Sequence, residues 1–170
     1  ETYSAFRARG FDIDIIHPGQ DLSGYGLILV PCLPILPEGF VERLRATDAV
    51  LLIGPRTGSK TADFQIPKDL PPGPLSALTQ TRIGRVESLR PNMAEPVTGG
   101  GAVVHWLEHV SGDADTLAET QSGQPVWCRA GRVHHLTGWP DTVLMSRLVR
   151  AVSAAARLVP EDLPDGLRLA

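Results

Sequence analysis

The chain lacks the features of membrane-spanning, secreted and nucleic-acid-binding proteins. No apolar run approaches the roughly 18 residues that cross a bilayer, and no signal peptide opens the chain. It has only two cysteines, Cys32 and Cys128, both beside apolar residues typical of strands. We therefore expect buried free thiols and a cytoplasmic protein. The net charge is −3, so neither a nucleic acid nor a membrane is an expected partner.

What the chain does have is the composition of one globular domain. Of its 170 residues, 42% are hydrophobic and 21% are charged, which is enough for a substantial core. Residues 1–9 have a helical pattern without a starting methionine or an N-cap, and residues 165–170 resemble the start of a strand. We therefore expect residues 1–170 to form a single domain that is a fragment of a longer chain.

The first half alternates predicted strands and helices. Residues 26–30 and 49–53 are unbroken apolar runs, as in strands that are buried on both faces of a parallel sheet. Residues 11–16 alternate apolar and acidic side chains, which predicts a strand near the sheet edge. A helix with one apolar face is predicted over residues 38–47. This order predicts a three-layer α/β fold with a flavodoxin-like, doubly wound parallel sheet.

The second half adds antiparallel hairpins and a closing helix. After a short helical turn over 75–78, alternating patterns predict strands over 81–87, 102–110, 126–129 and 133–136. Ala130-Gly131 joins the last two strands in a hairpin. The final helix is predicted over 141–158. Its expected apolar face consists of Val143, Leu144, Leu148, Val152 and Ala155.

The Gly/Pro-rich loop after residues 49–53 nearly matches the phosphate loop G-x-x-x-x-G-K-[ST]. Gly54, Lys60 and Thr61 are in place, but Ser59 replaces the glycine that lets backbone N–H groups surround a phosphate. Prolines between residues 67 and 74 exclude the helix that must follow at once. The sequence therefore predicts a structured surface loop and no phosphate site.

The same loop keeps both glycines of G-x-C-x-G, the nucleophile elbow of class I glutamine amidotransferase-like proteins. Arg56 stands where the thiol belongs, and a guanidinium cannot accept an acyl group because it stays protonated. Trp139-Pro140-Asp141 resembles the His-Pro-Glu tripeptide of these proteins, with Trp139 in place of the general base. Asp141 can cap the following helix. We therefore predict this fold without its catalytic residues.

Two histidine patterns suggest a metal site, and both are better explained as strands. His105-Trp106-Leu107-Glu108-His109 matches the zinc pattern H-x-x-E-H, which requires a helix. On the predicted strand the two histidines lie roughly 13 Å apart and Glu108 points to the opposite face. We interpret this stretch as a half-exposed strand with polar residues on both faces. Adjacent strand residues such as His134 and His135 also face opposite ways, so we predict no metal and no other cofactor.

Short stretches along nearly the whole chain match one known family. They are Tyr3–Arg7, Gly10–Asp14, Asp21–Tyr25, Pro55–Gly58 with Lys60, Pro71–Leu75, Trp106–Glu108, Gly131–His134 and Gly138–Asp141. Each stretch is weak evidence alone. In this order and spacing they resemble the middle domain, often called the trimerisation domain, of the glycoside hydrolase family 42 β-galactosidases.

The resemblance implies a structural domain inside a larger enzyme. Such enzymes carry a catalytic TIM barrel, an amidotransferase-like middle domain and a small C-terminal β domain, and they form homotrimers. They hydrolyse terminal non-reducing β-D-galactose residues with retention, using two barrel glutamates that lie outside this chain. The implied role here is non-catalytic and oligomerising, with the barrel of the same polypeptide as a partner. Alone, the fragment is expected to be a monomer or a weak oligomer, and it is expected to hydrolyse no galactoside.

The altered elbow and its surroundings supply the candidate functional residues. We predict interface contacts or loop anchors at Arg56, Thr57, Lys60, Trp139 and Asp141. Two other classes stay open at this point. An amidotransferase-like hydrolase would have to use Cys32 as its nucleophile. A carbohydrate-binding module would use Trp106, Trp127 and Trp139 as stacking surfaces.

Overall fold

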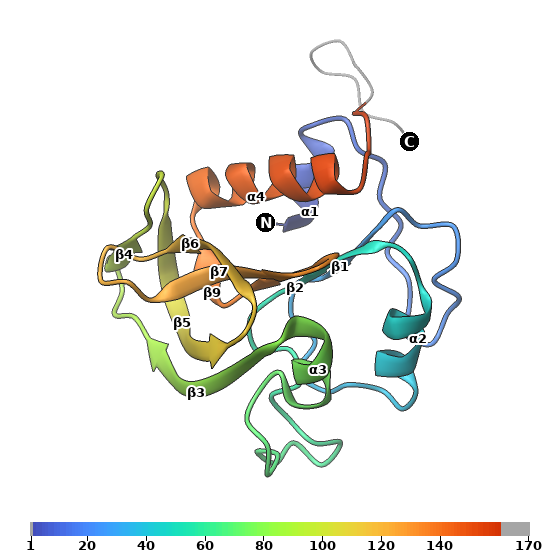
Figure 1. Cartoon of the computed structure of the whole chain (residues 1–170), viewed down its shortest axis with the longest axis horizontal. Helices are drawn as coiled ribbons and strands as arrows, with labels where there is room; N and C mark the ends of the chain where they lie inside the picture. Colours follow the sequence, from blue (N-terminus) through green and yellow to red (C-terminus); the bar gives the residue numbers. More distant parts are fainter. Residues whose placement is uncertain (1, 161–170) are drawn as a thin grey trace.

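Five strands of a mixed sheet carry most of the core in the computed structural model, which describes residues 2–160 (Figure 1). In spatial order they are Leu27–Val30 (β1), Val50–Ile53 (β2), Val133–Leu136 (β8), Pro125–Ala130 (β7) and Asp115–Glu119 (β6). β1, β2 and β8 run parallel, whereas β7 and β6 are antiparallel to their neighbours. The parallel strands thus place their carboxyl ends at one edge of the sheet.

A second, antiparallel sheet is inserted between β2 and β8 in the chain. Its spatial order is Thr81–Ser88 (β3), Ala102–Gly112 (β5) and Ala94–Pro96 (β4). The short strand Gly138–Pro140 (β9) also pairs with β5. Since β9 directly follows β8, the long strand β5 is held against the carboxyl edge of the first sheet.

Helices cover both faces of the first sheet. Thr2–Arg7 (α1) and Thr142–Ala155 (α4) lie on one face, and Phe40–Ala46 (α2) and Ser76–Thr79 (α3) on the other (Figure 1). A 3₁₀ turn, Gly73–Leu75 (η1), leads into α3. This arrangement is an α/β fold, as the patterns predicted, with one mixed and one antiparallel sheet. None of the helices in residues 2–160 is long and apolar enough to span a bilayer.

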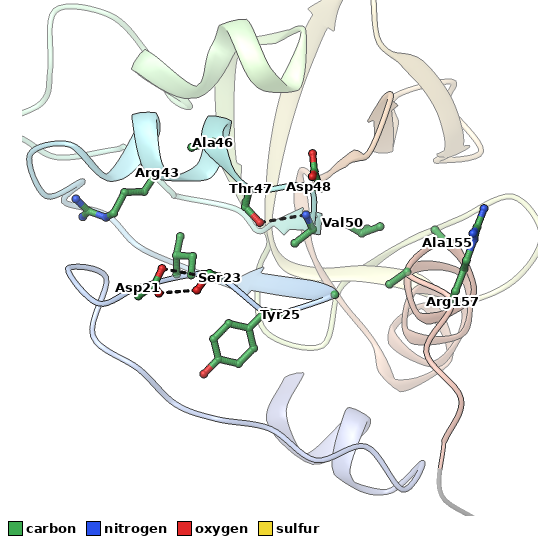
Figure 2. A pocket seen from close by; sticks show the side chains of 15 residues that line it. Asp21, Ser23, Tyr25, Arg43, Ala46, Thr47, Asp48, Val50, Ala155 and Arg157 are labelled. Carbon is green, nitrogen blue, oxygen red and sulfur yellow. Dashed lines mark hydrogen bonds between the residues drawn. The ribbon is translucent and has the colours of Figure 1, made fainter.

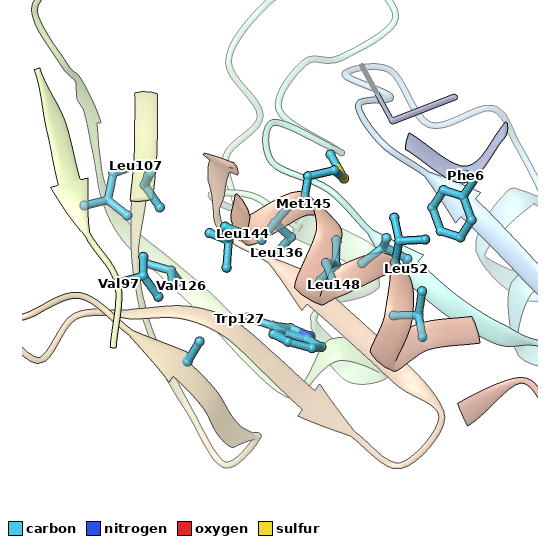
Figure 3. Packing of buried hydrophobic residues seen from close by; sticks show 14 of the residues in the cluster. Phe6, Leu52, Val97, Leu107, Val126, Trp127, Leu136, Leu144, Met145 and Leu148 are labelled. Atoms are coloured by element: carbon cyan, nitrogen blue, oxygen red, sulfur yellow. The ribbon is translucent and has the colours of Figure 1, made fainter. Parts of the chain in front are cut away.

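The two hydrophobic clusters lie on opposite faces of β2. Leu52 packs with Leu136, Leu144 and Leu148 on the α4 face (Figure 3), whereas Leu51 and Ile53 join the cluster under α2. Every residue of β2 is buried. Because helices cover both faces, the strand is continuously apolar and does not alternate.

Most predicted elements are confirmed within a few residues. The strands over 26–30 and 49–53, the helix at 38–47, the turn before β3, strands β3 and β5, and the closing helix all form. Of the two strands predicted to be fully buried, only β2 is, because β1 lies at the edge of the sheet and three of its four residues are partly exposed. The hairpin between β7 and β8 also forms, with Ala130 opposite Val133 and Gly131 at φ 58°.

Residues 11–16 do not form the predicted edge strand. This segment has no ladder partner, although its alternation is real. Ile13 packs against the cluster on the α4 face and Ile16 against the cluster on the α2 face. Ile15 is 85% exposed, so the alternation in this segment does not correspond to one buried face.

The apolar face predicted for the last helix was partly wrong. Val143 is 53% exposed and Ala155 is also exposed, whereas Met145 and Val149 are buried beside Leu144. The buried face of α4 is rotated from the predicted one, because the helix packs on α1 as well as on the sheet. The strand predicted at residues 165–170 lies outside the described residues.

Candidate functional site

The loop after β2 forms a sharp elbow at the carboxyl edge of the sheet. Arg56 has φ 64°, a left-handed conformation that is uncommon for a residue with a long side chain. Only glycine fits at the two flanking positions, because a side chain there would clash with the backbone. A Cβ on Gly54 would come within 2.0 Å of the Pro31 carbonyl oxygen, and one on Gly58 within 2.8 Å of the Pro72 carbonyl oxygen. The Gly-x-x-x-Gly spacing therefore marks a real turn.

A buried carboxylate holds this elbow from the second sheet. Glu108 of β5 is 1% exposed, and its Oε1 accepts the backbone N–H of Arg56 at 2.8 Å. The same oxygen accepts the indole N–H of Trp106 at 3.0 Å. Oε2 of Glu108 has no hydrogen-bond partner among the described residues.

Burial and hydrogen bonding act on the pKa of Glu108 in opposite directions. Burial raises the pKa of Glu108, and this effect outweighs the hydrogen bonds from Trp106 and from the Arg56 backbone and the charge of Arg56. Oε1 of this carboxyl group thus joins the elbow backbone to the indole of Trp106.

The side chain of Arg56 faces solvent over an aromatic ring. Its Cζ lies 5.1 Å from the centre of the Trp106 ring, a cation–π arrangement. The residue as a whole is exposed. The backbone of Arg56 is thus anchored by Glu108, while its guanidinium is presented at the surface.

Thr57 and Lys60 tie the elbow to the segment that follows β1. Thr57 is 1% exposed, and its Oγ1 accepts the backbone N–H of Leu33 at 3.3 Å. The backbone N–H of Lys60 donates to the Pro34 carbonyl at 2.9 Å, within a parallel bridge between Lys60 and Ile35. Both contacts hold two neighbouring loops together.

Trp139 and Asp141 occupy the other side of the carboxyl edge. Trp139 lies on β9, opposite Val104 of β5, and lines a recess of about 510 Å³ with Pro55 and Cys32. Asp141 is the N-cap of α4, with Oδ1 accepting the backbone N–H of Leu144 at 2.7 Å. The structure therefore brings Trp139 to the side of the elbow, while Asp141 caps the helix.

The two alternative functions receive little support from this geometry. Burial raises the pKa of Cys32, with Glu108 adding to the rise and Arg56 opposing it, which disfavours the thiolate that a nucleophile requires. The three tryptophans have different surroundings. Trp106 lies under Arg56, Trp127 is 5% exposed within the core, and Trp139 lines the recess.

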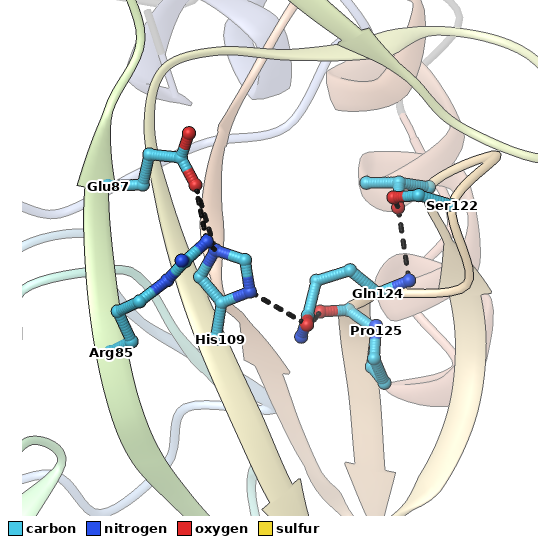
Figure 4. Close-up of polar contacts among 7 residues, drawn as sticks. Arg85, Glu87, His109, Ser122, Gln124 and Pro125 are labelled. Carbon is cyan, nitrogen blue, oxygen red and sulfur yellow. Dashed lines mark hydrogen bonds and ion pairs between the residues drawn. The ribbon is translucent and has the colours of Figure 1, made fainter.

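The H-x-x-E-H stretch is a strand, as predicted, and the described residues hold no group of three or more histidine, cysteine or acidic side chains suited to a metal. His109 instead takes part in a polar cluster (Figure 4). Its Nε2 lies 3.0 Å from Glu87 Oε2 and its Nδ1 lies 2.9 Å from Gln124 Oε1. The hydrogen bond to His109 is the main cause that lowers the pKa of Glu87. These contacts link β3 and β5 to the turn before β7.

His134 and His135 point to opposite faces of β8, as expected. The indole N–H of Trp127 donates to Nδ1 of His134 at 3.1 Å, and Thr81 Oγ1 lies 2.8 Å from Nδ1 of His135. Burial lowers the pKa of each histidine to about 4, with a smaller contribution at His134 from the charge of Arg129. Both rings are therefore neutral structural groups at neutral pH.

A second cavity, of about 570 Å³, lies at the amino ends of β1 and β2 (Figure 2). Its polar groups serve local turns. Asp21 accepts the hydroxyl and the backbone N–H of Ser23, which lowers the pKa of Asp21. Thr47 Oγ1 accepts the backbone N–H of Ala49 at 3.1 Å, and Arg43 donates to a backbone carbonyl at 2.7 Å. The carboxyl edge, where α/β sheets usually bind ligands or partners, remains the candidate site.

The sequence patterns did not predict the role of Glu108 in this site. We expected a half-exposed strand with polar residues on both faces, whereas Glu108 is buried beneath the elbow. Its pairing depends on an irregularity in β5 at His105, which has φ 62°. No local pattern marks that irregularity, so only the tertiary structure shows the contact.

The geometry defines an α/β domain whose left-handed elbow presents the guanidinium of Arg56 at the carboxyl edge of the sheet. Residues 1–159 match the family model of the beta-galactosidase trimerisation domain, and the chain belongs to this family.

Known proteins agree with this assignment. A beta-galactosidase of Thermus thermophilus is 44% identical over 170 residues, and the match covers 98% of this chain and 26% of the relative. A beta-galactosidase of Halorubrum lacusprofundi is 29% identical over 198 residues, covering 98% of this chain and 28% of the relative. The chain thus spans about a quarter of the length of these curated relatives.

Solved structures show the same fold. The beta-galactosidase from the psychrophilic Marinomonas ef1 superposes with a TM-score of 0.92 at 34% identity, covering 98% of this chain and 26% of that one. The enzyme from Bacillus circulans sp. alkalophilus has a TM-score of 0.92 at 19% identity, covering 99% and 28%, which supports the fold alone.

Proposed function

We propose that this chain is the non-catalytic oligomerisation domain of a homotrimeric β-galactosidase. In the whole enzyme, a TIM barrel outside this chain hydrolyses terminal non-reducing β-D-galactose residues with retention. The observation that carries the proposal is the match of residues 1–159 to a trimerisation domain. The free thiols of Cys32 and Cys128 support a cytoplasmic setting, where disulfides are rare.

We also infer that the domain is a class I glutamine amidotransferase-like fold that has lost its catalytic residues. Support comes from the parallel order of β1, β2 and β8 and from the elbow that follows β2. At that elbow Arg56 has the positive φ of a strained strand-to-loop turn. Trp139 beside the same edge replaces the base.

Within this domain we assign anchoring and interface roles to different atoms of the elbow. Thr57, Lys60 and the backbone of Arg56 anchor the loop through the contacts described above, and Asp141 caps α4. The guanidinium of Arg56 is the interface element, because the residue is exposed and its guanidinium lies over the ring of Trp106. An exposed, always charged fork suits a carboxylate on the barrel or on a neighbouring subunit.

The first test separates the domain from its parent enzyme. Light scattering of the full-length protein should give the mass of a trimer, and the protein should hydrolyse a chromogenic β-galactoside. The 170-residue chain alone should hydrolyse neither that substrate nor glutamine. Turnover by the purified chain that disappears when one of its own residues is changed would overturn the proposal.

The second test concerns Arg56. In the full-length enzyme, Arg56→Met should shift trimer dissociation to higher protein concentration. The melting temperature of the isolated chain should change little, because an exposed cation–π contact contributes only about 0.5–1 kcal/mol. Arg82→Met, a matched change at another exposed arginine, should leave the trimer intact. Equal trimer stability in the native enzyme and in both variants would show that Arg56 does not contribute to the interface.

A further inference from the structure

The chain that follows the elbow leaves the body of the domain as an apolar loop. In Figure 1 this loop, between β2 and α3, extends past α3 and away from both sheets. We call residues 61–70 the arm. The side chains of Phe64, Ile66 and Leu70 are 72%, 73% and 49% exposed. Three large apolar side chains within seven residues form a patch of the kind that marks a protein interface.

The tip of the arm is ordered before any partner binds. The backbone N–H of Phe64 donates to the Thr61 carbonyl at 3.0 Å, and the backbone N–H of Thr61 donates to the Gln65 carbonyl at 2.9 Å. Thr61 Oγ1 also accepts the backbone N–H of Gln65 at 3.1 Å. These bonds hold Phe64 at φ 61°, a conformation that is costly for a bulky residue. A strained and fixed aromatic at a loop tip is a preorganised contact residue.

The symmetry of a trimer determines which kind of surface such an arm can contact. A closed ring of three identical chains is built from heterologous contacts, in which each copy uses two different surfaces. In such a contact, an apolar projection on one copy packs against a different surface of the next copy, and an apolar recess is the surface that fits it.

The recess beside Trp139 has the required character. Its volume of about 510 Å³ lies within the range of small-molecule and side-chain pockets. It is lined mainly by Tyr3, Cys32, Leu52, Trp139, Met145 and Leu148. Apart from the Cys32 thiol and the polar ends of two aromatic rings, these side chains are apolar, so the recess suits an aliphatic or aromatic side chain better than a sugar.

Arm and recess lie on opposite sides of the first sheet. The recess is on the α4 side, where Figure 3 shows Leu52, Met145 and Leu148, and the arm leads into η1 and α3 on the other side (Figure 1). One copy therefore presents its arm away from its own recess. This is the arrangement that a head-to-tail ring requires.

We propose that, in the trimer, the arm of each subunit inserts Phe64 and Ile66 into the recess of the next subunit. The inference rests on the proposed trimerisation function and assigns the two surfaces that carry it. The partner is a second copy of this chain, recognised by an apolar knob and an apolar hole.

The native thiol of Cys32 in the recess allows a direct test. In the full-length enzyme, Ile66→Cys under mild oxidation should form a disulfide with Cys32 of the next subunit and give covalent dimers and trimers on a non-reducing gel. The additional change Cys32→Ser should abolish these bands. Ile15→Cys, whose parent side chain is 85% exposed outside the arm, should give no Cys32-dependent band.

A second variant tests the contribution of the contact without new cysteines. Phe64→Ser combined with Ile66→Ser should raise the concentration at which the trimer dissociates at least about tenfold, as expected when central apolar contacts are lost. Val86→Ser, at an exposed apolar residue of β3, should have no such effect.

The outcomes separate this inference from the function on which it rests. A full-length enzyme that is monomeric by light scattering contradicts both. A trimer without Cys32-dependent bands, or with a disulfide formed only inside one subunit, overturns the arm-and-recess contact and leaves trimerisation standing.

Discussion

Replacement of Glu108 tests whether the elbow depends on the buried acceptor beneath it. We compare Glu108→Leu, which removes the acceptor, with Glu108→Gln. The glutamine side chain has nearly the same shape, keeps one acceptor oxygen and carries no charge. In the native chain Oε1 of Glu108 accepts two hydrogen bonds, from the backbone of Arg56 at 2.8 Å and from the indole of Trp106 at 3.0 Å. The leucine variant leaves both donors without this partner.

The expected loss follows from those two donors. Stranding a buried donor costs about 1–3 kcal/mol, and both donors here are partly buried, which places each near the lower end. Removing a carboxyl group that is 1% exposed offsets a part of the loss. We therefore expect Glu108→Leu to lower the free energy of unfolding by about 2 kcal/mol. Glu108→Gln should stay within about 1 kcal/mol of the native chain near pH 5.

The pH dependence supplies an independent check. Burial raises the pKa of Glu108 above the ordinary value of 4.5, so the folded state binds this proton more tightly than the unfolded state. The contribution of Glu108 to stability is complete below pH 4.5 and is lost as the pH rises through the folded pKa. Glutamine does not titrate. The stability of Glu108→Gln relative to the native chain should therefore increase from pH 5 to pH 8.

Urea unfolding followed by tryptophan fluorescence at both pH values measures these differences. The reasoning is refuted if the leucine variant loses no more stability than the glutamine variant. It is also refuted if the difference between the glutamine variant and the native chain does not change with pH.

Three further predictions concern polar residues at or near the carboxyl edge of the first sheet. Thr57→Val should lower the free energy of unfolding by about 1 kcal/mol, because Leu33 loses its hydrogen-bond acceptor, while Thr57→Ser should be nearly neutral; equal losses in urea unfolding would contradict this. Asp141→Ala should cost about 1 kcal/mol through loss of the N-cap, with Asp141→Asn as the retaining control, and thermal melting would show an error if both variants matched the native chain. Because burial lowers the pKa of His134 and His135 to about 4, the unfolded state binds more protons below pH 6.5. Stability should fall between pH 6.5 and 4 by up to about 3 kcal/mol per histidine, and a flat urea profile across that range would refute their buried neutral state.

Local sequence patterns identified most of the elements that build this edge. The unbroken apolar run of β2, the two glycines around Arg56 and the cap at Asp141 all formed as predicted. Each of these signals depends on residues a few positions apart. An unbroken apolar run, a glycine-flanked turn and an N-cap side chain are features of the local chain, and the chemistry of the residues indicates them directly.

What lies beneath the elbow was decided by the tertiary structure. Glu108 is 52 positions from Arg56 in the chain, and it meets that backbone because the second sheet is placed across the carboxyl edge. Alternation predicted Glu108 and the histidines on opposite faces of β5, but it could not show which face would be covered or that the strand is irregular at His105. The same limit explains the segment 11–16, whose alternating pattern predicted a strand but which has no ladder partner. A local pattern sets which residues share a face. Burial of that face depends on distant parts of the chain and their register.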